Sequence, residues 1–169
     1  MAAASRFFLE FDLPARGVDL IQPEISYAHP LPDGRAALAH QSLDATCGEL
    51  GRDGQAWRAL MEPLLARSRP LVDFVLAGQR SLPQDLVAPL LLLRGMLTHG
   101  TALARHVFAG EEAAALLAGV AAHVVGRIPT PSSAAVALLL GHLAHGSGWP
   151  VARGVLPFPA GGTCCARPC

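Results

Sequence analysis

Hydrophobic and polar residues alternate along residues 24–31, a pattern typical of a β-strand with one buried face. The Pro-Asp-Gly sequence at 32–34 is a turn signal, because proline presets φ and glycine accepts a positive φ. Residues 36–40 would return as a second strand, so we predict a β-hairpin over residues 24–40. One face of its first strand would carry Ile25, Tyr27, His29 and Leu31. Proline cannot donate to a strand ladder, so Pro30 should lie at an edge or at the strand end.

The pattern changes to a helical period after the hairpin. Ser42 is a predicted N-cap for a short helix that stops near Gly51. Apolar residues then recur at steps of three and four along residues 57–75. Pro63 and Pro70 interrupt this segment, and a proline inside a helix costs about 3 kcal/mol. We therefore expect a kink or a break into two helices.

Helical patterns continue beyond a loop predicted at residues 78–83. One helix is expected over residues 84–97, broken near Gly95 or Gly100, and a short one over residues 101–108. These segments extend the helical part of the chain.

Two more helices complete the prediction. The glutamates at 111–112 favour a helix start, because carboxylates stabilise the positive end of the helix dipole, and that helix should end at Gly126. After a Pro-Thr-Pro linker, Ser132 or Ser133 would cap a last helix that reaches His145. The expected fold class is α+β, mainly helical, with the hairpin followed by about five to six helices.

The composition is apolar. Hydrophobic residues make up 51% of the 169-residue chain and charged residues 15%, whereas about 25% charged is usual. The longest apolar runs, 86–93 and 134–140, fall short of the roughly 20 residues that span a membrane. We therefore expect apolar surface that meets a partner domain, a lipid or a lipidic substrate.

Charge and cysteine content limit the partners and the compartment. The chain has 13 basic and 13 acidic residues, and this balance argues against nucleic acid as a partner. The N-terminus has no basic region ahead of an apolar stretch, so we expect no signal peptide and a reducing compartment. A cytoplasmic protein is expected, with peripheral membrane contact as the alternative.

Motifs for nucleotide binding and acid–base catalysis are missing from the sequence. It contains neither G-x-G-x-x-G nor G-x-x-x-x-G-K-[ST], the glycine-rich loops that cradle phosphates. The acidic residues form no pair that periodicity would aim into a pocket. We predict no catalytic residue and no FAD, NAD or ATP binding by this chain in the usual modes.

Histidine and cysteine give two weaker alternatives. His142 and His145 are three residues apart on a predicted helix and could hold a metal together with His123, but ordinary packing is the favoured interpretation. Cys47 as a nucleophile is likewise less favoured than Cys47 as a packed side chain. No metal site is predicted, because the tail cysteines lack the spacing of a zinc site: Cys164, Cys165 and Cys169.

Several stretches, taken together, resemble one family in their order and spacing. They are Gln22-Pro-Glu-Ile-Ser-Tyr-Ala-His-Pro-Leu31 with Asp33-Gly34-Arg35, Ser42-Leu-Asp-Ala-Thr46, Gly51-Arg-Asp-Gly-Gln-Ala-Trp57 with Pro63-Leu64, the segment 111–123, and Leu140-Gly-His-Leu-Ala-His145 running into Gly148-Trp-Pro-Val-Ala-Arg-Gly154. Over residues 5–154 the chain resembles the middle segment of phytoene-dehydrogenase-like FAD-dependent oxidoreductases.

The resemblance implies a segment of a two-domain flavoprotein. In that family a Rossmann-type domain binds FAD, and an inserted substrate domain covers the flavin and receives apolar substrates such as carotenoid precursors. This chain would supply the substrate domain and meet a carotenoid- or lipid-like molecule. The FAD would be held by a missing FAD domain, so the chain alone should be inactive and free of FAD.

The resemblance also implies roles for particular residues. The substrate side would carry Tyr27, His29 and Leu31, and the cofactor edge would carry Trp149, Pro150 and Gly154. After Gly154 the sequence departs from the family's Gly-Gly-Ser pattern. We expect residues 1–154 to form the substrate-domain segment. Residues 155–169 would be an irregular, non-native or disordered tail, produced by a shifted reading frame or a misassigned gene end. The competing hypothesis is a non-enzymatic helical module that binds a lipid or a protein.

Overall fold

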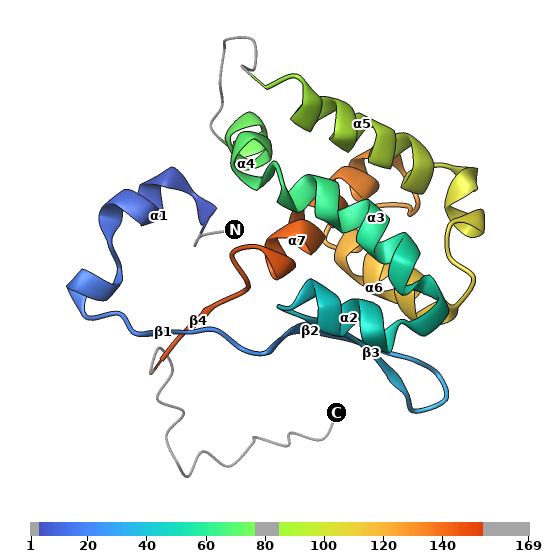
Figure 1. Cartoon of the computed structure of the whole chain (residues 1–169), viewed down its shortest axis with the longest axis horizontal. Helices are drawn as coiled ribbons and strands as arrows, with labels where there is room; N and C mark the ends of the chain where they lie inside the picture. Colours follow the sequence, from blue (N-terminus) through green and yellow to red (C-terminus); the bar gives the residue numbers. More distant parts are fainter. Residues whose placement is uncertain (1–3, 77–84, 154–169) are drawn as a thin grey trace, which may run out of the picture.

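The computed structural model describes residues 4–76 and 85–153, and within them the chain is mainly helical with a small antiparallel hairpin near the N-terminus (Figure 1). This confirms the α+β, mainly helical fold class. The loop predicted at 78–83, Gly154 and the tail 155–169 lie outside the described residues.

An N-terminal arm precedes the hairpin and was not predicted. It contains α1 (Arg6–Phe11), the 3₁₀ helix η2 (Pro14–Arg16) and β1 (Leu20–Ile21), which pairs antiparallel with β4 (Val151–Ala152). The Arg153 backbone N–H donates to the Asp19 carbonyl at 2.7 Å, which extends this pairing. Strands of two residues carry no period, so the sequence could not reveal them.

The predicted hairpin is present as β2 (Ile25–Pro30) and β3 (Ala36–His40). Gly34 in the turn has φ +82°, and Pro30 is the last residue of its strand, as expected. The prediction that Ile25, Tyr27, His29 and Leu31 share one strand face is wrong at both ends. A register shift between Ile25 and Tyr27 leaves Ile25 40% exposed, while Tyr27 packs on the core. Leu31 lies beyond the strand, in the turn.

The segment from Ser42 to residue 76 follows the prediction closely. The Ser42 side chain caps α2 (Leu43–Glu49), and the 3₁₀ helix η3 (Gly51–Asp53) leads into α3 (Gly54–Leu65). The expected break separates α3 from α4 (Ser68–Leu76). Pro63 lies in the last turn of α3 and Pro70 in the first turn of α4, where each disrupts few helical hydrogen bonds.

The remaining helices are α5 (Val87–His99), the 3₁₀ helix η4 (Ala102–His106), α6 (Glu111–Ala121) and α7 (Pro131–His145). Helix α5 begins at Val87 and not at residue 84, and it passes unbroken through Gly95 and stops before Gly100. The boundaries of α6 and α7 also differ from the prediction. Helix α6 ends at Ala121, five residues before Gly126, through turns at its C-terminus. The cap of α7 is Thr130, with Ser133 completing a capping box, so a serine cap was wrong by a few residues.

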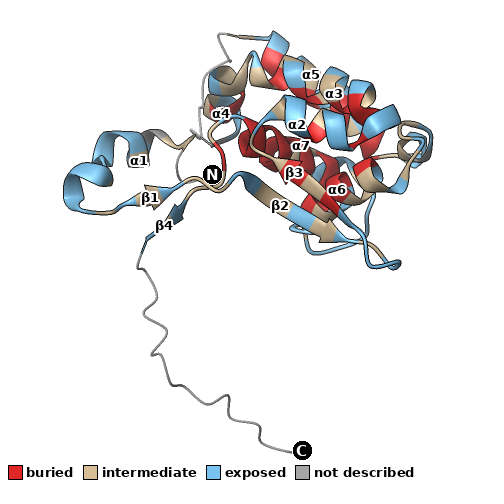
Figure 2. Cartoon of the chain, turned by 60° about the horizontal axis from the view of Figure 1, so that its bottom comes forward, coloured by how far each residue is buried: buried red, intermediate tan, exposed pale blue. Residues whose placement is uncertain are grey.

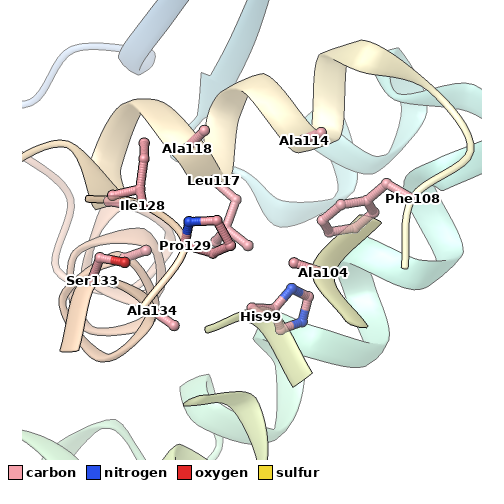
Figure 3. Close-up of a pocket in the computed structure, with 12 residues that line it drawn as sticks. His99, Ala104, Phe108, Ala114, Leu117, Ala118, Ile128, Pro129, Ser133 and Ala134 are labelled. Atoms are coloured by element: carbon pink, nitrogen blue, oxygen red, sulfur yellow. The ribbon is translucent and has the colours of Figure 1, made fainter. Parts of the chain in front are cut away.

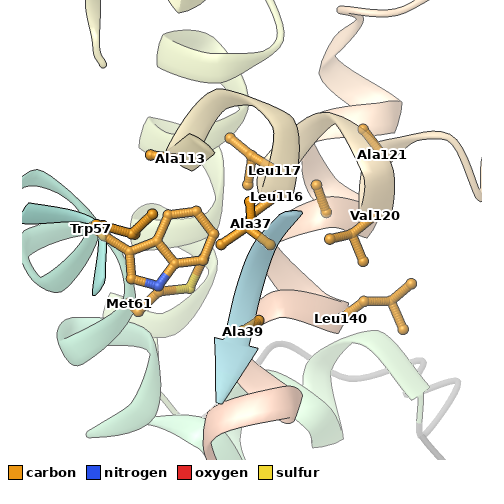
Figure 4. Close-up of a cluster of buried hydrophobic side chains, with 12 residues drawn as sticks. Ala37, Ala39, Trp57, Met61, Ala113, Leu116, Leu117, Val120, Ala121 and Leu140 are labelled. Carbon is orange, nitrogen blue, oxygen red and sulfur yellow. The ribbon is translucent and has the colours of Figure 1, made fainter. Parts of the chain in front are cut away.

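The core lies around α7, which contacts α3, α5 and α6 and is buried along most of its length (Figure 2). A helix that is apolar on all sides is stable only when other elements surround it. The largest cluster joins β3 to α3 and α6. In Figure 4, Trp57 and Met61 lie on one side of β3, and Val120 and Ala121 lie on the other.

Several large apolar side chains remain on the surface of the described residues. Helix α5 carries a row of four leucines that are 48–61% exposed: Leu86 just before its start, then Leu90, Leu93 and Leu97. In the described part of the chain, each helix is too short or too polar to cross a bilayer.

Candidate functional site

A partly open cavity of about 360 Å³ lies between α6, the start of α7 and the end of α5 with η4 (Figure 3). Alanines create much of this space, because a methyl side chain at a helix–helix contact leaves room that a larger residue would fill. They come from three helical elements: Ala104, Ala114, Ala118, Ala121, Ala134 and Ala137. The other apolar walls are Phe108, Leu117, Ile128 and Pro129.

Two polar side chains, His99 and Ser133, are among the described residues that line the cavity. The Ser133 hydroxyl is engaged in the capping box of α7, where it accepts from the Thr130 backbone N–H at 2.9 Å and donates to the Thr130 carbonyl at 2.9 Å. Ser133 is 1% exposed. Its hydroxyl is therefore occupied by hydrogen bonds at the start of α7 and offers little to the cavity.

His99, the last residue of α5, is 6% exposed. Its Nδ1 is buried and has no hydrogen-bond partner among the described residues. Its ring lies 5.7 Å from the Phe108 ring, centroid to centroid, and burial lowers the pKa of the imidazole. His99 is therefore a mainly neutral hydrogen-bonding group on an apolar wall.

A second cavity, of about 240 Å³, lies between α3 and α5 and is also bordered by His99. It has a more polar lining, which includes Arg94 and Thr98. His99 thus stands between an apolar and a more polar space.

The five described residues among the six predicted from the resemblance do not line the apolar cavity. Two of them meet: the Tyr27 ring stacks on the Trp149 ring at 5.0 Å between centroids, and His123 contacts Trp149 edge-on at 6.5 Å. Burial raises the pKa of Tyr27 well above its ordinary range. The Tyr27 hydroxyl and the Trp149 indole N–H are buried without a partner among the described residues.

The other four predicted residues are spread out. His29 lies against Gly119 of α6, where a Cβ would come within 2.6 Å of the imidazole Nδ1. Leu31 and Pro150 are half-buried, and Gly154 lies outside the described residues. Their assignment to a substrate or a flavin stays a prediction.

The helical histidines pack into the core. His145 Nε2 accepts from the Trp57 indole N–H at 3.1 Å, and His142 Nδ1 donates to the Leu138 carbonyl at 3.2 Å. Burial lowers the pKa of both imidazoles. Within residues 4–76 and 85–153, no group of three or more His, Cys, Asp or Glu side chains is arranged to hold a metal.

The Cys47 thiol has its pKa raised, chiefly by burial, which disfavours the thiolate that a nucleophile requires. The tail cysteines Cys164, Cys165 and Cys169 lie outside the described residues. Neither cysteine alternative gains support.

Sequence reasoning missed the cavity and His99. One signal was available: His99 ends a strongly apolar segment that begins at residue 86, and small residues recur at 114, 118 and 121. That spacing puts alanines on one helix face, but it does not reveal which other helix would face them.

No family model, curated protein or solved structure matches this chain.

Proposed function

We propose that this chain is the apolar-substrate-binding segment of a FAD-dependent oxidoreductase of the phytoene-dehydrogenase-like kind. The observation that carries the proposal is the alanine-walled cavity between α5, α6 and α7. Pockets of about 300–1,000 Å³ with apolar walls and few polar groups are typical of small-molecule sites. The stretches of sequence that resemble the family in their order and spacing give independent support.

The described residues do not fit FAD itself. A dinucleotide pyrophosphate is commonly bound by free backbone N–H groups at a helix N-terminus. Side chains of this chain occupy four such ends: Ser42 on α2, Asp53 ahead of α6, Asp85 on α5 and Thr130 on α7. The apolar cavity contains no basic residue among its described lining. We therefore assign the flavin to protein outside these residues.

Within this proposal the chain binds the substrate and orients it toward the flavin. When FAD is bound by its own domain, it supplies the redox chemistry. The cavity would hold the substrate away from water. The stack of Tyr27 on Trp149 is the proposed edge toward the flavin, since the family's chain returns to the flavin domain near this position.

The flavin assignment is tested by incubating the purified chain with FAD and removing free FAD by gel filtration. We expect a folded chain without flavin absorbance. Stoichiometric flavin in the protein peak would contradict the assignment, because it would require a dinucleotide site within this chain.

The alternative is a non-enzymatic helical module that binds a protein or a lipid. It is favoured by the α5 leucines, since the spacing of Leu86, Leu90, Leu93 and Leu97 in steps of four, three and four is that of a helix–helix seam. The L90E/L97E double variant discriminates between the functions. A module would lose its partner, whereas ligand uptake by the cavity, which these leucines do not line, would persist.

A further inference from the structure

Among the described residues that line the apolar cavity, His99 is the side chain that can offer a hydrogen bond to a ligand. His99 borders the cavity and is 6% exposed, and its imidazole makes no hydrogen bond to the other described residues, its Nδ1 being fully buried; Ser133, in contrast, is engaged with Thr130. A buried polar atom without a partner costs about 1–3 kcal/mol, so an unpaired imidazole on a cavity wall suits a ligand that supplies a hydrogen bond. Figure 3 shows the His99 ring beside Ala104 and Phe108, across from Ile128 and Pro129.

We propose that this cavity binds a small neutral apolar molecule, or the end of a longer apolar chain, that carries a single hydroxyl or carbonyl, with His99 as its hydrogen-bonding partner. The inference deepens the proposed function by naming the substrate class of its site, and the substrate role rests on that function. The binding itself is a property of this chain and can be measured on it.

The size of the cavity limits the ligand. An apolar cavity of about 150 Å³ takes a benzene ring. At about 360 Å³, this cavity has room for an apolar group of roughly ten carbons. Phe108 and Leu117 offer bulky surface to such a group, and the alanines let it approach the backbone of α6.

The charge of the cavity selects a neutral ligand. No Arg, Lys, Asp or Glu is among its described lining residues. Since burial lowers the pKa of His99, the imidazole is mainly neutral near neutral pH and offers no strong counter-charge to a carboxylate. Moving an ionised carboxylate into such surroundings is costly without a charged partner. An alcohol, which both donates and accepts, suits either tautomer of the neutral imidazole.

Three matched probes and three variants test this inference by calorimetry or by displacement of N-phenyl-1-naphthylamine. The probes are α-terpineol, an isoprenoid alcohol, limonene, the hydrocarbon of the same skeleton, and perillate, a related carboxylate. His99→Phe keeps a ring but removes the hydrogen bond. Ala118→Phe fills the cavity from an exposed position on α6, and Ala115→Leu is the control on the same helix outside the lining.

In the wild-type chain we expect both neutral probes to bind and perillate to bind more weakly than α-terpineol. His99→Phe should weaken α-terpineol about three- to tenfold, which is the net worth of one hydrogen bond, and leave limonene unchanged or tighter. Ala118→Phe should abolish binding of both, and Ala115→Leu should bind as wild type. Circular dichroism of each variant checks that the helical fold is kept.

Three results would overturn the inference: no uptake of either neutral probe by the folded wild-type chain, an equal loss of both probes in a folded His99→Phe variant, or tighter binding of perillate than of α-terpineol. If His99→Phe does not fold, Ala118→Phe still decides whether the probes occupy this cavity. None of these results depends on flavin. The FAD incubation and the assembly with a flavin domain test the oxidoreductase proposal separately.

Discussion

Three buried histidines make the stability of this chain depend on pH. Burial lowers the pKa of His99, His142 and His145, whose side chains are at most 8% exposed. Each is therefore mainly neutral in the folded chain near neutral pH but protonates readily in the unfolded chain, where the ordinary pKa is about 6.5. The unfolded state then binds more protons, so stability rises with pH through this range.

We expect the free energy of unfolding to fall as the pH drops from about 7 to about 5. The fall should reach up to about 1.4 kcal/mol per pH unit for each histidine that protonates only on unfolding. Urea titrations at several pH values measure it. A flat profile in the wild-type chain would contradict the burial of the three imidazoles.

A single carboxylate ties η3 to the start of α6. Asp53 is 5% exposed and accepts from the backbone N–H groups of Ala109 at 2.8 Å and Gly110 at 2.6 Å. We expect Asp53→Ala to lower the free energy of unfolding by about 1.5–3 kcal/mol, because hydrogen bonds to a charged group are lost and two N–H groups are left without their acceptor. Glu62→Ala, at an exposed position on α3, should change it by less than about 0.5 kcal/mol. Equal effects of the two substitutions would contradict this account.

Individual site residues were harder to predict than the elements that carry them. Tyr27 and Trp149 were both singled out, and the structure stacks them, although they are far apart in sequence. The cavity and His99 were not foreseen, because a cavity arises where three elements fail to fill the space between them. That depends on side-chain packing across the fold, which the periodicity of one segment does not contain.

At the scale of elements, close approach of α5 to α7 requires a glycine. A Cβ at Gly100 would lie 2.6 Å from the Cα and 2.7 Å from the N of Pro131, and backbone cannot move aside as a flexible side chain can. We expect Gly100→Ala to destabilise the fold by about 1–3 kcal/mol through overpacking. Gly48→Ala is the matched control: its Cβ would meet nothing within 4 Å, and it should be neutral or stabilising by up to about 1 kcal/mol. Thermal unfolding of both variants decides, and equal shifts would contradict the packing of α5 on α7.

The helices and the hairpin could be predicted because each has a local cause. Serine capping set the start of α2, and two prolines separated α3 from α4. The ends of α6 and α7 were less accessible, since Thr130 outcompeted the serines as a cap and α6 stopped well before a glycine. The β1–β4 pair was invisible for another reason: its partners are remote in sequence and each is two residues long.

At the scale of the whole molecule, two features reflect the apolar composition. One is the cavity between α5, α6 and α7, and the other is the surface, where the leucines of α5 remain exposed. Exposed apolar rows of this kind mark surfaces that meet a partner. The composition alone predicted exposed apolar surface. It could not show how much of that surface lines a ligand site and how much forms an interface with a partner.

The central claim is that this chain is the substrate-binding segment of an enzyme whose FAD lies outside these residues. It is tested most directly by co-expressing the chain with the product of a neighbouring reading frame that encodes G-x-G-x-x-G, followed by co-purification and an absorbance spectrum. We predict a stable complex with flavin absorbance that neither this chain nor the Ala118→Phe variant shows alone. Genomic flanks without such a frame, or a flavin-binding product that does not associate with this chain, would contradict the claim.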